Sequence, residues 1–300
     1  MAQGIEVLKK RILVLGSTGL IGHQVFNYLQ CNGQYELYNF AYRKPLQNDT
    51  VILDARNEEK YLKKIGDVAP DFIVNCVGIL INGANINPEN AIFLNAYMPH
   101  RLARLADEIN AKLIHISTDC VFSGNKDTAY IETDAKDGLG IYAKTKALGE
   151  VISEDHLTLR TSVVGPELKN DGEELFHWFM NQNGAIDGYT KAIWSGVTTL
   201  ELAKAVDFSI RAGITGLHHV TNNTSINKYE LLRLFQKYTG KDITIIPITG
   251  KSSNKSFIDT RLLMGYRIPS YDQMVADMVT LIANNRKLYS QYNVGMGDQD

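Results

Sequence analysis

The stretch RILVLGSTGLIG, residues 11–22, decides the fold of this 300-residue chain. Its first part, RILVLG, is an apolar run that ends in glycine, which is typical of a strand buried on both faces. A helical pattern follows, with Ile21, Val25 and Leu29 four residues apart and Gly33 placed to end the helix. The stretch therefore predicts a strand, a tight turn and a helix in direct succession.

Three glycines occupy the turn, Gly16, Gly19 and Gly22, at GxxGxxG spacing. Small residues there permit a tight turn and let the backbone approach a pyrophosphate closely. The helix N-terminus that follows offers free N–H groups and a partial positive charge to phosphate. A glycine-rich turn without a ligand is the alternative, but the strand–turn–helix context favours a dinucleotide site.

The same alternation of strand and helix patterns continues through the first half of the chain. Further strands are expected at YELYNFAY (35–42), TVILD (50–54), DFIVNCVGIL (71–80), KLIHISTDCVF (112–122), LTLRTSVVG (157–165) and GLHHVTN (216–222). A helical spacing lies between the third and fourth of these segments, over residues 96–110. This pattern predicts an α/β fold, a doubly wound parallel sheet of the Rossmann type with helices on both faces.

The pattern loosens after residue 165. Residues 166–195 are polar and rich in glycine, so we expect loops with one short helix. Helical patterns return over residues 198–210, 227–240 and 271–285. We predict an NAD(P)-binding domain over residues 1–165, to which residues 196–222 return, and a smaller mixed lobe for the substrate over residues 166–300.

Composition excludes several classes of partner. With 31 basic and 33 acidic residues the formal charge is only −2, which gives no electrostatic footprint for nucleic acid or a membrane surface. The longest apolar runs fall short of the roughly 20 residues of a membrane span, and the first residues lack an apolar signal core. Three cysteines, none in a CxxC pair, indicate reduced thiols in a cytoplasmic protein with neither a disulfide framework nor a metal site.

The end of the second strand decides the expected cofactor. An acidic residue there would bind the ribose 2′-hydroxyl of NAD, but this chain has Arg43 and Lys44. Two cations suit the extra 2′-phosphate of NADP, so we expect NADP, with NAD as the alternative; the charges can also belong to a solvated loop. Asp54, at the end of the third strand, can accept a hydrogen bond from the adenine amine or simply face solvent.

The segment IYAKTKALGE, residues 141–150, contains a second spacing that matters. Residues four apart on a helix share one face, so Tyr142 and Lys146 can act together, whereas Lys144 points away from them. Upstream, Ser117, Thr118 and Asp119 lie at the C-terminal end of a strand, where α/β sheets bind ligands. By themselves such hydroxyls often only satisfy the backbone of a turn.

The ordered set of GxxGxxG, a strand-end hydroxyl and YxxxK resembles the extended branch of the short-chain dehydrogenase/reductase superfamily. The resemblance is closer to dTDP-4-dehydrorhamnose reductase-like proteins. The blocks that carry it, spread from residue 11 to about 265, are STDCVFSG, YAKTKALGE, LRTSVVGPE, GVTTLELAK and GLHHVTNNTSINKYEL.

The resemblance implies roles for three residues. Tyr142 would donate a proton to a ketone oxygen as hydride reaches its carbon, and Thr118 would orient that oxygen. Lys146 would hold the nicotinamide ribose and lower the pKa of Tyr142 from its ordinary value near ~10. The residues expected at the cofactor are Gly16, Thr18, Gly19, Leu20, Ile21, Gly22, Arg43, Lys44, Asp54, Ala55, Cys76, Val77, Gly78, Asn95, Tyr142 and Lys146. Asn95 would brace the backbone at the site or cap a helix.

The implied activity is NADPH-dependent reduction of a 4-keto group on a nucleotide-activated deoxy sugar, in the cytoplasm, by a monomer or a homodimer. Two alternatives stay open. One is a nucleotide-binding regulatory subunit resembling the beta subunit of methionine adenosyltransferase. The other is an NAD-dependent nucleotide-sugar epimerase, which the lack of an acidic residue around Arg43 disfavours.

The chain also departs from the family pattern. Cys120 stands where tyrosine is usual, and Val163 and Gly165 stand where a tryptophan and a different loop are common. Trp194 can stack on a nucleobase or fill the interface between the lobes. These departures leave the sugar open.

Overall fold

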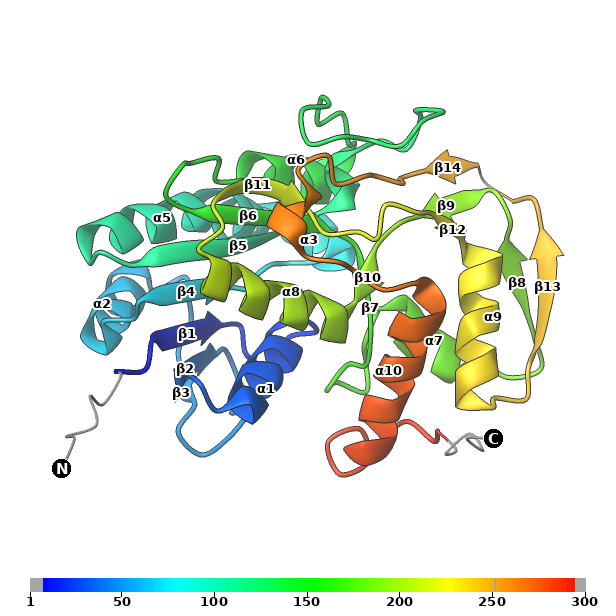
Figure 1. Cartoon of the computed structure of the whole chain (residues 1–300), viewed down its shortest axis with the longest axis horizontal. Helices are drawn as coiled ribbons and strands as arrows, with labels where there is room; N and C mark the ends of the chain where they lie inside the picture. The colour runs from blue at the N-terminus through cyan, green and yellow to red at the C-terminus, as the bar shows by residue number, and fades with distance from the viewer. Residues whose placement is uncertain (1–7, 251, 295–300) are drawn as a thin grey trace.

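The computed structural model describes residues 8–250 and 252–294, and a seven-stranded parallel sheet forms its centre (Figure 1). The strand order is β11-β6-β5-β4-β1-β2-β3. The strands are β1 (Arg11–Leu15), β2 (Glu36–Ala41), β3 (Val51–Ile52), β4 (Phe72–Asn75), β5 (Lys112–Thr118), β6 (Leu157–Thr161) and β11 (Gly216–His219). Their pairing is parallel throughout, which confirms the predicted α/β fold.

Helices cover both faces of this sheet because β1 buries side chains on both sides. Ile12 and Val14 join a core with α1 (Gly22–Asn32) and α8 (Thr199–Ala212). Leu13 and Leu15 join a second core with α2 (Glu58–Val68) and α5 (Met98–Glu108) on the other face. All four side chains are fully buried, as expected of an apolar strand at the centre of a doubly wound sheet.

The helices expected from periodicity are present. They include α6 (Gly140–Leu148), which carries the YxxxK segment, α9 (Lys228–Thr239) and α10 (Tyr271–Asn284). Gly33 and Gly240 end α1 and α9 in the left-handed conformation, with φ of 63° and 67°.

The segment after β4 differs from its prediction as a strand through residue 80. The strand ends at Asn75, whose side-chain oxygen accepts a hydrogen bond from the Val77 N–H (3.1 Å) and so replaces the strand ladder with a turn. Short helical pieces follow and lead into α5: α3 (Ile81–Ile86), α4 (Pro88–Ala91) and the π-helix η1 (Ile92–Tyr97).

A smaller lobe lies at one end of the molecule, where Figure 1 shows α9 beside two short sheets. Strand β8 (Ala185–Tyr189) pairs with β13 (Thr244–Ile248), and β9 (Ala192–Trp194) lies between β12 (Ile226–Asn227) and β14 (Ser253–Asn254). The expected short helix is α7 (Leu175–Met180), but the expectation of loops missed β8 and β9. Their partners come from far along the chain, so local sequence carries little signal for them.

The remaining elements are short. They are β7 (Val163–Val164), β10 (Val197–Thr198) and two 3-10 turns, η2 (Asp119–Val121) and η3 (Leu262–Gly265). Strand β7 pairs with β10, and β11 then pairs with β6 at the edge of the main sheet. The division into two domains at residue 165 stays a prediction.

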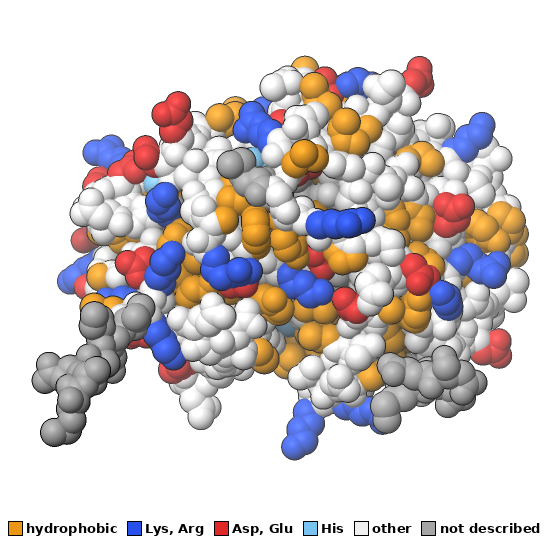
Figure 2. Space-filling view, in the orientation of Figure 1, with side chains coloured by type: hydrophobic (Ala, Val, Ile, Leu, Met, Phe, Trp, Pro, Cys, Tyr) orange, Lys and Arg blue, Asp and Glu red, His pale blue; other side chains and the backbone are white. Residues whose placement is uncertain are grey.

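The surface carries charges of both signs. On the face in Figure 2, basic and acidic side chains are interspersed and do not gather into a patch of one sign. No helix within residues 8–250 and 252–294 is long and apolar enough to cross a membrane.

Candidate active site

The glycine-rich turn after β1 is held by backbone contacts. Gly16 adopts a φ of 77°, which favours glycine, and the N–H groups of Gly16 and Ser17 donate to the Phe40 carbonyl of β2 at 2.9 and 3.0 Å. A Cβ on Gly22 would collide with the Gly16 carbonyl oxygen, so only glycine permits this close packing. No described side chain caps the start of α1 at Ile21, which leaves N–H groups of its first turn available to an anion.

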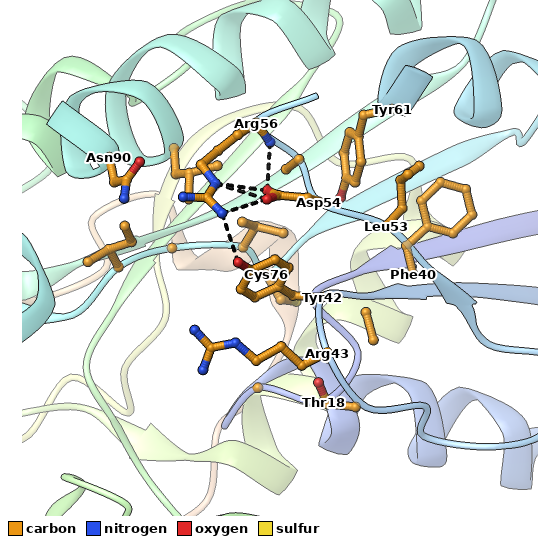
Figure 3. Close-up of a pocket in the computed structure, with 18 of the residues that line it drawn as sticks. Thr18, Phe40, Tyr42, Arg43, Leu53, Asp54, Arg56, Tyr61, Cys76 and Asn90 are labelled. Atoms are coloured by element: carbon orange, nitrogen blue, oxygen red, sulfur yellow. Dashed lines mark hydrogen bonds and ion pairs between the residues drawn. The ribbon is translucent and has the colours of Figure 1, made fainter. Parts of the chain in front are cut away.

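A cavity of about 360 Å³ opens beside this turn (Figure 3). Nine of the residues expected at the cofactor line it: Gly16, Thr18, Gly19, Arg43, Asp54, Ala55, Cys76, Val77 and Gly78. The other lining residues are Phe40, Ala41, Tyr42, Leu53, Arg56, Tyr61, Ile79, Asn90, Leu94 and Lys169. Among these described residues three are cationic and one is a carboxylate, so the cavity suits an anionic ligand.

Two guanidinium groups enclose an aromatic ring at one end of the cavity. Tyr42 lies between Arg43 and Arg56 in Figure 3, with their guanidinium carbons 4.8 and 5.6 Å from the ring centroid. Arg56 also donates to both oxygens of Asp54 (Nη2 to Oδ2, 2.6 Å) and to the Tyr42 hydroxyl (2.8 Å). Hydrogen bonds from Arg56 lower the pKa of Asp54, so that carboxylate is ionised and already engaged.

The sequence analysis did not predict Tyr42, Arg56 or Lys169 at this cavity. Arg56 lies two residues after Asp54, and a cation so close to a strand-end carboxylate was a usable signal. Lys169 had none, because it comes from the second half of the chain.

Seven residues expected at the cofactor do not line the cavity: Leu20, Ile21, Gly22, Lys44, Asn95, Tyr142 and Lys146. Gly22 acts through the packing described above, and Lys44 is exposed. Asn95 braces a cavity wall, since its side chain accepts from the Ile79 N–H (2.8 Å) and donates to the Ile79 carbonyl (2.9 Å). Its place inside η1 fits bracing and not capping.

Thr118, Tyr142 and Lys146 lie beyond the cavity, at the end of β5 and on α6. Thr118 accepts from the Cys120 N–H (3.1 Å) and donates to Asp119 (3.2 Å), and its hydroxyl also contacts the phenol of Tyr142. Lys146 is buried, and its ammonium counteracts the rise in the pKa of the Cys76 thiol that burial causes. Cys76 lines the cavity, so Lys146 lies close to the cavity wall.

Burial shapes the protonation of this group. It lowers the pKa of Lys146 to about 8, against the opposing effects of Glu150 and Cys76. It raises the pKa of Tyr142, contrary to the expectation that Lys146 lowers it. Burial of the phenol outweighs the hydrogen bond with Thr118, and the Lys146 ammonium donates to the Ile116 carbonyl of β5 (2.8 Å). The phenol is therefore protonated at neutral pH, whereas Lys144 is exposed on another face of the helix.

A buried ion pair fixes the end of α6. Arg160 of β6 donates to both oxygens of Glu150 (2.8 and 2.7 Å), and Ser117 of β5 donates to Oε1 (2.7 Å). Burial alone would raise the pKa of Glu150, but hydrogen bonds from Arg160 and Ser117 lower it below its ordinary value. The pair joins α6 to two strands of the sheet.

One departure from the family pattern, Cys120, lies near Tyr142. Cys120 approaches the Lys255 ammonium (3.6 Å), and burial raises the pKa of its thiol to about 11. Trp194 is 4% exposed and packs against Tyr271 at 5.7 Å between ring centroids, so it fills the lobe rather than presenting a face to a base. Within residues 8–250 and 252–294, no three His, Cys, Asp or Glu side chains group to hold a metal ion.

Comparisons with known proteins agree with the fold and the motifs. The chain is 33% identical to dTDP-4-dehydrorhamnose reductase of Escherichia coli over 158 residues, 51% of each chain. It therefore spans about half the length of the first curated relatives it matches. It is 29% identical to methionine adenosyltransferase 2 subunit beta of Bos taurus over 76% of this chain and 71% of that one.

A solved structure has the same fold, that of dTDP-4-dehydrorhamnose reductase from Bacillus anthracis in complex with NADP. Its TM-score is 0.79 at 21% identity, over 91% of this chain and 100% of that one. The model of the RmlD substrate binding domain matches residues 10–257. This chain belongs to the RmlD substrate binding domain family.

Proposed function

We propose that this chain uses NADPH to reduce the 4-keto group of a nucleotide-activated deoxy sugar. The observation that carries the proposal is a cavity lined by cations at a glycine-rich turn, with the buried Lys146 close to the lining residue Cys76. The activity named for the relative from Escherichia coli and the NADP bound in the similar structure support it. Residues 1–165 would hold the cofactor, and residues 166–300 the sugar nucleotide.

The residues at the turn fit a dinucleotide. The uncapped start of α1 offers N–H groups to phosphate, and Gly16 and Gly22 keep side chains out of the turn. Arg43 stands at the end of β2, where a 2′-phosphate would need a cation.

The mechanism follows from the protonation of the site. When bound, NADPH supplies the hydride to the carbonyl carbon. The half-buried, protonated phenol of Tyr142 donates its proton to the ketone oxygen, which Thr118 orients, and solvent later restores that proton. Lys146, with a pKa of about 8, is mainly cationic at neutral pH and is assigned to the nicotinamide ribose.

The direct test measures the rate of NADPH oxidation when each of a panel of nucleotide 4-keto sugars is added. Tyr142→Phe removes the proton donor and should lower turnover by at least ~10²-fold. Tyr189→Phe, an exposed tyrosine elsewhere, is the matched control and should retain turnover. Wild-type turnover in Tyr142→Phe would remove that residue from the mechanism.

A regulatory, nucleotide-binding role is the second candidate, favoured by the similarity to methionine adenosyltransferase 2 subunit beta. A stoichiometric complex with an enzyme partner, with no turnover on any sugar, would support it. An epimerase is disfavoured, since Arg43 follows β2 and Asp54 is engaged by Arg56.

The proposal includes a cytoplasmic location, where NADPH serves as reductant, and a homodimer. Exposed apolar side chains on adjacent elements support the dimer, among them Ile81, Ile92, Tyr97 and Leu148. The mass of the purified chain in solution tests the dimer: one chain has a mass of 33.5 kDa, and a dimer has twice that mass.

A further inference from the structure

One lining residue of the cavity comes from the opposite lobe. All other described lining residues lie between Gly16 and Leu94, whereas Lys169 belongs to the loop between β7 and α7. This loop carries Lys169 across to the cavity that Gly16, Thr18 and Gly19 line from the sheet. The cavity is therefore closed by two parts of the chain that are far apart in sequence.

The base of this loop is fixed. Glu167 is buried; its N–H donates to the Tyr292 hydroxyl (2.9 Å), and its carboxylate accepts from the Glu174 N–H (2.9 Å) across the loop. The Asn170 carbonyl, next to Lys169, lies 3.2 Å from Nε2 of His177. The structure thus presents Lys169 from a tethered loop, and its side chain is exposed and pairs with no acidic side chain among the described residues.

The other two cations of the cavity lie together at one end of it. Arg56 is paired with Asp54, and Arg43 lies over the Tyr42 ring, both at the end formed by β2 and the turn after β3. The start of α1 offers only neutral N–H groups. Among the described lining residues, Lys169 is the cation not engaged with Tyr42 or Asp54.

We infer that the Lys169 ammonium binds the pyrophosphate of the dinucleotide, so that the smaller lobe contacts the cofactor directly. The inference rests on the proposed function. A lysine suits this task because it binds phosphate as a mobile point charge and needs no fixed geometry. Pyrophosphate is common to NADPH and NADH, so this contact serves both cofactors equally.

The test is a fluorescence titration of each reduced dinucleotide, without sugar, into wild type and Lys169→Met. The dissociation constants of NADPH and NADH should both rise about 10-fold, which corresponds to the weaker end of the range for a hydrogen bond to a charged group. The ratio of the two constants should not change. Affinity should also fall less steeply with salt, because one ion pair is lost. Lys169→Arg should keep most of the affinity. Lys191→Met, an exposed lysine of the same lobe outside the cavity, is the control.

Each contrary result of this titration overturns either the inference about Lys169 or the proposed function. Unchanged dissociation constants in Lys169→Met, with wild type binding normally, would overturn this inference alone. A loss confined to NADPH would place Lys169 at the 2′-phosphate and also overturn it. A wild type that binds neither dinucleotide would overturn the proposed function, and this inference with it.

Discussion

The glycine-rich turn and helix α6 serve one edge of one sheet but are held in place differently. The turn is fixed by backbone atoms of Gly16, Ser17 and Gly22, within seven residues, together with the Phe40 carbonyl. The end of α6 is fixed by side-chain charge, through Glu150 and its partner Arg160 from β6. A site made by close backbone packing depends on the absence of side chains, whereas a site made by a buried ion pair depends on both partners being present.

The largest effect is expected where the ion pair is broken. Arg160→Met leaves the fully buried Glu150 carboxylate with Ser117 and Lys136 alone, and should lower the free energy of unfolding by about 3–5 kcal/mol at neutral pH. Equilibrium unfolding in urea measures this free energy for both proteins. Lys144→Met, an exposed change on the same helix, should stay within about 0.5 kcal/mol of wild type.

The loss should depend on pH in a defined direction. In wild type the pKa of Glu150 is below its unfolded value, so its contribution is present above that value and is lost as pH falls through the folded pKa. In Arg160→Met the Glu150 carboxyl keeps Ser117 and Lys136 but loses its guanidinium partner, so its pKa should rise and the variant should regain stability on protonation. The difference in free energy of unfolding between wild type and Arg160→Met should therefore decrease as pH falls toward ~4. A difference that stays constant with pH would mean that the variant is destabilised mainly by lost packing.

A smaller effect is expected at the turn. Gly22→Ala places a methyl group against the Gly16 carbonyl, which should lower the free energy of unfolding by about 1–3 kcal/mol and abolish dinucleotide binding. Gly66→Ala in α2 is the matched control, because a Cβ there meets no atom within 4 Å. Alanine in place of that helical glycine should stabilise by up to ~1 kcal/mol. Equal behaviour of the two variants would contradict the packing account.

Arg43→Ala should leave stability unchanged and alter only cofactor choice. Arg43 is exposed at the cavity rim, so its loss should weaken NADPH by roughly 10- to 150-fold and NADH little. The ratio of kcat/KM values with the two cofactors measures the change. An equal, smaller loss for both would show that Arg43 only stacks on the adenine; an unchanged ratio would remove it from the site and reopen the epimerase alternative.

The same contrast explains how much the sequence could predict. The central sheet, α1 and the glycine turn follow from residues close together in the chain, and each was predicted. The spacing of Tyr142 and Lys146 placed both on α6, but not the hydrogen bond from Lys146 to Ile116, which joins residues 30 apart. Strands β8 and β9 and the cavity residue Lys169 were missed, because their partners are far along the chain, up to 153 residues away for Lys169 and Gly16, and no local periodicity records them.

The position of Asn95 in the cavity wall depends on the number of residues in helix η1. The Met98 N–H bonds to the Phe93 carbonyl five residues back, so this hydrogen-bonded loop contains one residue more than the loop of an α-helix. Each residue of an α-helix turns the chain by about 100°. Deleting one residue here would let the helix wind normally and swing Asn95 away from the Ile79 backbone that it braces. In this segment, then, the number of residues is under stricter control than the identity of the exposed ones, and a single-residue deletion would be worse tolerated than most substitutions.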